Sequence, residues 1–175
     1  MKKLILTIAF IAIGIAICPL QAHALNKKDL QILGRALGFI ENGPSGDIQI
    51  GIVQNIDNPH SVLEANDMIS LINGGIHSGR LNIHAKKITP NAASTGKFPV
   101  LYFTQGTEAQ QSQIFNAVTT KGVITVSTHE SCLTTKSCVL VIQSMPTVNI
   151  KVSKAAARST GVSFGSAFRM MVSEH

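Results

Sequence analysis

Side chains able to carry acid–base or metal chemistry are few and scattered in this sequence. The chain has nine acidic residues and six histidines among 175 residues. A metal site read from sequence needs ligands at short, regular spacings such as H-x-H or H-E-x-x-H, and none occurs here. No paired carboxylates suggest acid–base catalysis, and Thr95-Gly96-Lys97-Phe98 is only a fragment of a phosphate loop. We therefore expect no enzyme activity, no cofactor and no metal; the isolated internal histidines are His60, His77, His84 and His129.

The first 24 residues have the pattern of a secretory signal peptide. Two lysines follow the first methionine, residues 4–17 are apolar, and Ala22-His23-Ala24 has the A-x-A form of a cleavage site. We expect cleavage after Ala24, which leaves 175 − 24 = 151 residues in an exported, periplasmic chain. A transmembrane anchor needs about 20 apolar residues, more than this run supplies. Cys18 offers a lipoprotein alternative, although the bulky Ile17 precedes it.

Cys132 and Cys138 are the only cysteines after the signal peptide. In an oxidising compartment such a pair predicts a disulfide, which here pins a short loop, residues 131–137, to the strand that follows. A thiol oxidoreductase favours C-x-x-C at a helix start, whereas five residues separate these cysteines. Catalysis is therefore not expected, but redox sensing stays open beside the structural role.

Positive charge gathers in the second half of the chain. After the signal peptide the net charge is 13 − 9 = +4, made of −3 over residues 25–78 and +7 over residues 79–175. A basic surface suits an acidic partner or a membrane face. One tyrosine and no tryptophan leave no stacking platform for bases, so we expect no nucleic acid. Weak candidates for partner contact are Lys136, Lys154, Arg158 and Arg169.

Apolar periodicity and breaker residues place these side chains on alternating elements. Helices are predicted over residues 27–40, 59–72, 107–119 and 154–160, and a terminal helix carries Phe164, Phe168 and Met171 on one face. Strands are predicted over residues 47–54, 81–89, 98–103, 122–127, 138–142 and 148–152, with a loop over 91–97. The expected helix start signals are Asn26, Asn58-Pro59, a Thr107/Gln110 capping box, and Ser153, whose helix ends at Gly161.

This order predicts one α/β domain over residues 25–175. We expect a mostly parallel central sheet of about five or six strands with helices on both faces, a Rossmann-like arrangement. No linker marks a second domain and no internal repeat is found.

The second half of the sequence resembles the YfiR-like (DUF4154) family. Ala155-Ala156-Ala157-Arg158 and Gly161 match that family's pattern directly, and Ser153 stands where the family has a capping Asn. Upstream, residues 99–104 (PVLYFT) and 122–127 (GVITVS) resemble two of its strands. The resemblance covers residues 98–172 well and the first half only in element order.

The resemblance implies a non-enzymatic periplasmic regulator that contacts an inner-membrane signalling protein. The best-known member of the family represses a membrane-bound diguanylate cyclase by binding its periplasmic part. A homodimer stays open. The alternative is a small-molecule-binding protein accessory to a transporter, because residues 50–65 run from a strand into a capped helix, where α/β sheets hold ligands.

Overall fold

The computed structural model describes residues 25–175, so the predicted signal peptide lies outside the described residues. The helices are α1 Lys27–Gly38, α2 Pro59–Ile72, α3 Pro90–Ala93, α4 Glu108–Val118, α5 Ser131–Thr134, α6 Lys154–Thr160 and α7 Ser166–Arg169, with a 3₁₀ turn, η1, at Thr119–Lys121. The strands are β1 Gly46–Val53, β2 Ile76–Ser78, β3 Leu81–Ile88, β4 Val100–Phe103, β5 Ile124–Ser127, β6 Leu140–Gln143, β7 Asn149–Val152 and β8 Ser173–Glu174.

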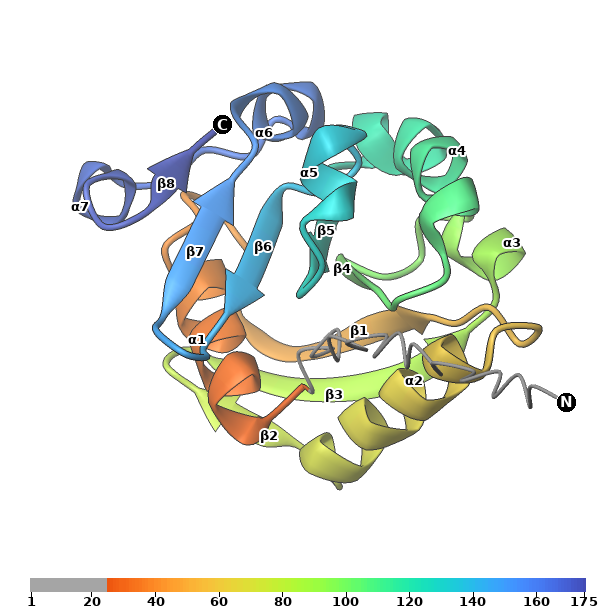
Figure 1. Ribbon diagram of the computed structural model, residues 1–175. Helices are drawn as coiled ribbons and strands as arrows, with labels where there is room; N and C mark the ends of the chain where they lie inside the picture. The colour runs from red at the N-terminus through yellow and green to blue at the C-terminus, as the bar shows by residue number, and fades with distance from the viewer. Residues whose placement is uncertain (1–24) are drawn as a thin grey trace, which may run out of the picture.

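All these strands form one sheet in the order β2-β3-β1-β4-β5-β6-β7-β8 (Figure 1). The core pairings from β3 to β6 are parallel, whereas β2 pairs antiparallel with β3 and β7 with β6. The expected α/β domain is present and most of the strand pairings are parallel as expected, but the sheet is mixed and has eight strands rather than five or six. The two unpredicted strands, β2 and β8, have three and two residues, too few to show an alternating pattern.

The middle of the sheet is buried on both faces, which explains the continuous apolar sequence of its strands. Every residue of β4 and β5 is buried. The chain leaves β1 through α2 toward β3, then turns back past β1 to β4 through α3. Because such crossovers are right-handed, the reversal puts α2 and α3 on opposite faces. Two apolar clusters result, one that includes α1 and α2 and one that includes α3, α4 and α5.

Three of the predicted helix starts have the expected caps. The Asn26 side chain accepts from the N–H groups of Lys28 and Asp29 in a capping box, and Asn58 caps α2 ahead of Pro59. Ser153 Oγ accepts from the Ala156 N–H, and α6 ends at Gly161 with a φ of +69°.

The capping box predicted at Thr107 and Gln110 is wrong. Thr107 has φ −102° and ψ 4° and makes no side-chain cap bond. Its hydroxyl instead donates to the Thr104 carbonyl over 2.6 Å and accepts from the Gln111 amide over 3.1 Å. The Thr107 hydroxyl is therefore used in these two hydrogen bonds and does not cap the first backbone N–H groups of α4.

The terminal helix is much shorter than predicted. Phe164 precedes it and forms a β-bridge with Ile40, while Phe168 is buried within α7. Met171 follows the helix and is 64% exposed, because the chain there straightens into β8 beside β7. Two other stretches predicted as loops each hold one helical turn, α3 and α5.

Candidate functional site

Polar side chains meet at the carboxyl ends of the central strands. β1 lies between β3 and β4, and the chain leaves β1 in one direction and β4 in the other. Open α/β sheets bind ligands in the crevice at such a reversal. Here α2 contributes Glu64, β4 contributes Tyr102, and the segment after β5 contributes Thr128 and His129. We call these four residues the Glu64 cluster.

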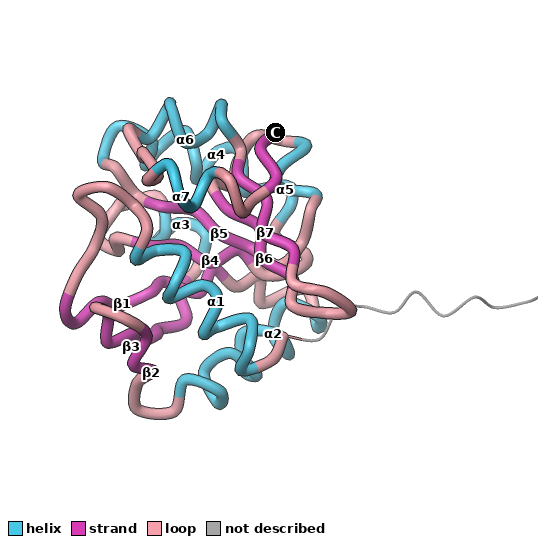
Figure 2. Tube along the Cα trace, turned by 90° about the vertical axis from the view of Figure 1, so that its left-hand side faces the viewer, coloured by secondary structure: helices cyan, strands magenta, loops and turns pink. Residues whose placement is uncertain are grey.

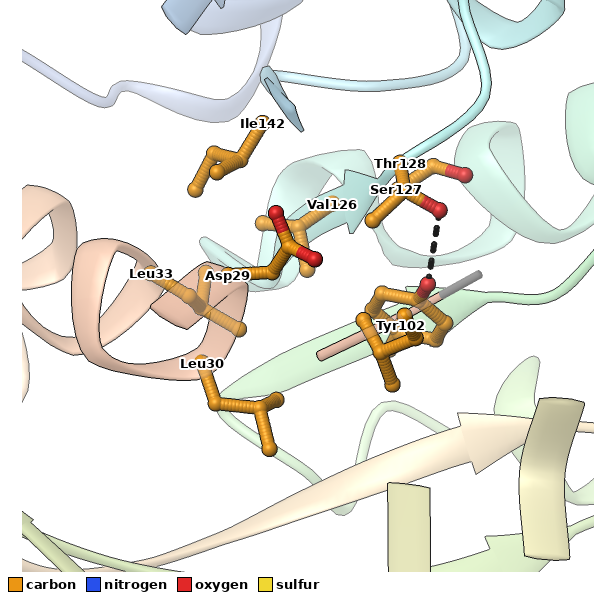
Figure 3. A pocket seen from close by; sticks show the side chains of 9 residues that line it. Asp29, Leu30, Leu33, Tyr102, Val126, Ser127, Thr128 and Ile142 are labelled. Atoms are coloured by element: carbon orange, nitrogen blue, oxygen red, sulfur yellow. Dashed lines mark hydrogen bonds between the residues drawn. The ribbon is translucent and has the colours of Figure 1, made fainter. Parts of the chain in front are cut away.

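The Glu64 carboxylate is the acceptor that joins the cluster. The Tyr102 hydroxyl donates to Oε1 over 2.5 Å, and the Gln105 backbone N–H donates to Oε2 over 2.7 Å. The Thr128 hydroxyl lies 3.4 Å from Oε1. It also lies 3.0 Å from the Tyr102 hydroxyl, and Figure 3 marks this second contact with a dashed line. His129 Nε2 lies 3.0 Å from Oε2. The Glu64 and His129 side chains are only 12% and 21% exposed, so the pair is largely screened from water.

The short distance between Glu64 and His129 shifts their pKa values in opposite directions. Burial by itself would raise the pKa of Glu64, but the hydrogen bond and positive charge of His129, with the Gln105 N–H and Tyr102, lower the pKa overall. Burial would lower the pKa of His129, but the hydrogen bond and charge of Glu64 raise it overall. Burial and the Glu64 charge together raise the pKa of the Tyr102 hydroxyl, which therefore stays a donor. The cluster favours a carboxylate facing an imidazolium.

A second polar network holds the start of α2 beside the cluster. The Ser61 and Thr104 hydroxyls lie 2.6 Å apart, and both side chains are fully buried. Thr104 donates to the Val53 carbonyl over 2.8 Å, and Ser61 accepts from the Asn55 N–H over 2.8 Å. Gly106 has a φ of +81°, and a Cβ there would lie 2.2 Å from the Asn58 amide. The turn after β4 thus fits tightly against the cap of α2.

The space next to the Glu64 cluster is small and mostly apolar. Figure 3 shows Asp29, Leu30 and Leu33 of α1 facing Tyr102 and Val126 across it. Asp29 is 2% exposed and accepts from the N–H groups of Asn26 and Ser144, each over 2.9 Å. The open volume holds about one water molecule. The geometry therefore indicates a polar network that holds α2, β4 and the end of β5 together, rather than a pocket for a metabolite.

The structure joins Cys132 to Cys138 by a disulfide, with the Cα atoms 5.4 Å apart. Both cysteines are fully buried against the cluster that includes α3 and α4. The bond ties the single-turn helix α5 to the entry of β6.

The four basic residues proposed from the sequence are all exposed, and they come from three different segments of the chain. Lys136 borders a hollow with Ala155 and Ser159 of α6, the helix that also carries Lys154 and Arg158. Lys154 Nζ lies 3.8 Å from Glu174 Oε2. Arg169 belongs to α7, which Figures 1 and 2 place apart from α5.

Other chemical motifs are not assembled in the described part of the chain. Among residues 25–175 no group of three or more His, Cys, Asp or Glu side chains is placed to hold a metal ion. The run Gly161-Val162-Ser163-Phe164-Gly165 has the spacing of a nucleophile elbow, but that motif requires a strand-to-helix turn. Here it connects α6 to α7, and the Ser163 carbonyl accepts from the Glu41 N–H.

Sequence reasoning missed the Glu64 cluster because its central pair is separated by 65 positions. One usable signal was present. Tyr102 lies in a fully apolar strand, and a buried tyrosine hydroxyl usually finds a partner. The sequence did not say which acid would supply that partner.

Comparison with known proteins gives one family and one fold. A protein-family model described as YfiR/HmsC-like (DUF4154) matches residues 32–171. No curated protein matches the chain. Among solved structures, the ligand-free, open form of a substrate-binding protein with adhesive properties from Clostridium difficile matches with a TM-score of 0.58 and 14% identity. The match covers 85% of this chain and 58% of that chain, and at this identity it describes the fold alone.

The Glu64–His129 pair predicts a specific pH dependence of stability. His129, whose pKa is raised above 6.5, stabilises the fold below that pH, and the effect is lost as the pH rises through its folded-state pKa. Glu64, whose pKa is lowered below 4.5, stabilises the fold above that pH, and the effect is lost on acidification through its folded-state pKa. The contribution should therefore be greatest between pH 4.5 and 6.5.

Urea unfolding of the wild type and His129→Gln between pH 5 and 8.5 measures this effect. The variant should lose about 1–2 kcal/mol near pH 5.5 and less near pH 8.5. His84→Gln is the matched control, since His84 lies 4.0 Å from the exposed Asp47 and should change little. An identical pH profile for the wild type and His129→Gln would contradict the assignment.

The disulfide should stabilise the domain modestly. Its cysteines are six positions apart, and closing so short a loop contributes about 2 kcal/mol through the unfolded chain. Cys132→Ala/Cys138→Ala should lower the free energy of unfolding by about this amount. Adding a reductant should destabilise the wild type but leave the double variant unchanged. Equal stability of wild type and double variant without reductant would show that the bond contributes nothing.

Proposed function

The chain belongs to the YfiR/HmsC-like family, and from this membership we propose that it is a non-enzymatic periplasmic regulator. It would act by protein–protein contact on an inner-membrane signalling protein, such as a diguanylate cyclase. The observation that carries the proposal is the family match over residues 32–171, which spans nearly the whole described domain. The Glu64 cluster supports the non-enzymatic part of the proposal, because its side chains form hydrogen bonds with one another.

A periplasmic location forms part of the proposal. The first 24 residues have the pattern of a cleaved signal peptide, and the disulfide suits an oxidising compartment. Within residues 25–175 no helix is long and apolar enough to cross a membrane. The exported chain would begin at Leu25 and meet the periplasmic face of its partner.

Regulation by contact requires only that the chain prefer one state of its partner. A bound protein shifts an equilibrium between two states by the difference in its affinity for them. The chain would hold the signalling protein in its inactive state and release it on a signal, for which redox change or envelope stress are the candidates.

Capture from solubilised membranes tests the proposal. The full chain is expressed with a C-terminal tag, and its mass should correspond to residues 25–175 plus the tag. It should retain an integral membrane protein with a cytoplasmic signalling domain, and purified partner should bind it again. A tagged periplasmic protein of another family is the control. Failure of the purified pair to bind would rule the proposal out.

Small-molecule binding is the second candidate function. The fold is shared with a substrate-binding protein, and the reversal point between β1 and β4 is where such sheets hold ligands. In this conformation the space beside the Glu64 cluster can hold nothing larger than a water molecule. A thermal-shift screen with amino acids, sugars and nucleosides distinguishes the two functions, because a ligand must raise the apparent stability. If the regulator proposal holds, none of them should shift the melting temperature.

A further inference from the structure

A mainly apolar groove lies between α1, β7 and α7, away from the Glu64 cluster. Figure 2 shows α1 in front with α7 above it and β7 beside it. The groove has a volume of about 940 Å³, open solvent included. Its apolar lining is contributed by Ile32, Ala36, Phe39, Val148, Ile150, Phe168 and Met171.

Aromatic packing forms the floor of this groove. Phe168 is 2% exposed and stacks on Phe39 and Phe164, with ring centroids 5.1 Å apart in each case. Phe39 closes the floor yet remains 43% exposed. Val148 and Met171 on the rim are 51% and 64% exposed. Apolar side chains of this size, exposed side by side over a buried aromatic, are typical of a binding surface.

The charged residues along the groove are both basic. Lys28 and Arg35 of α1 line it, seven positions apart, and therefore lie on the same side of the helix about 10 Å from each other. Asp29 points inward instead, where its carboxylate accepts from the N–H groups of Asn26 and Ser144. No acidic residue lines the groove.

The basic residues along the groove indicate which kind of segment would bind in it. In a two-fold dimer built on the groove, each apolar patch would face its own copy, and the cations of both chains would surround one apolar core. Like charges placed across an interface disfavour such pairing. A segment with an apolar face flanked by carboxylates complements the groove in both respects. Such a segment is an amphipathic helix lying along α1, the common way to fill a groove of this kind.

We infer that the groove between α1, β7 and α7 seats an acidic amphipathic helix of the membrane partner. The apolar face of that helix packs on Phe39, Val148 and Met171, and its carboxylates pair with Lys28 and Arg35. The adaptable side chain of Met171 accommodates the partner's side chains. This inference rests on the proposed function, since it locates the contact through which the partner is held.

Site-specific photo-crosslinking in cells tests the groove. A benzophenone amino acid replaces Val148 in the groove or, as the control, Leu63 of α2, which is 61% exposed on another surface. Illumination should cross-link the benzophenone at position 148, but not the one at position 63, to an acidic, amphipathic periplasmic segment of an integral membrane protein. Mass spectrometry of the adduct identifies that segment.

Charge reversal tests the basic rim. Arg35→Glu should lower the adduct yield at position 148 by about tenfold. Lys97→Glu reverses an exposed charge elsewhere and should leave the yield unchanged. Urea midpoints equal to wild type establish that each variant is folded.

The outcomes separate this inference from the proposed function. Adducts to a membrane protein from Leu63 but not Val148 overturn the groove and leave the regulator proposal standing. An adduct between two copies of the chain at Val148 overturns the acidic partner. A normal yield with Arg35→Glu overturns the charge pairing. No membrane adduct from either position overturns the groove, and the purified-pair binding experiment then decides the regulator proposal separately.

Discussion

The buried carboxylate of Glu64 constrains the elements that meet at the carboxyl ends of the central strands. Glu64 reaches from α2 across the ends of β4 and β5, and four groups surround its two oxygens. A charge this poorly hydrated is stable only when fully hydrogen-bonded, so α2, the turn after β4 and the segment after β5 must keep fixed positions. The single-turn helix with the disulfide begins two residues after His129. The positions of the strand ends, of the disulfide and of α2 therefore depend on one another.

The outer surfaces of the molecule follow from the direction of the chain in the sheet. The reversal at β1 sends α3, α4 and α5 to one face, where the cysteines complete a dry cluster. The other face receives α1, and the antiparallel turn into β7 lays the end of the chain beside it. Phe168 then packs under Phe39, and the exposed apolar groove forms between segments from opposite ends of the described chain. The position of this groove is a consequence of topology.

Local signals made much of the fold predictable. Asn26, Asn58-Pro59 and Ser153 each cap a helix as their sequence context indicates, and the apolar runs mark the buried strands. The strands β2 and β8 have three and two residues and α5 is a single helical turn, and their sequences carry no pattern from which they could be found. Thr107 had the right neighbours for a cap, but its hydroxyl bonds within the turn. The pairing of Glu64 with His129 and the groove at Phe39 depend on distant segments meeting, which only the tertiary structure supplies.

We propose that this domain regulates signalling from the periplasm by contact, and that the exposed apolar groove between α1, β7 and α7 is the surface that makes the contact. The most direct measurement is the cellular cyclic-di-GMP level after deletion of the gene, with return of either the full chain or a form lacking residues 2–24. Deletion should raise the level, and only the exported chain should lower it again. An unchanged level on deletion, or equal rescue by the form that stays in the cytoplasm, would contradict the proposal.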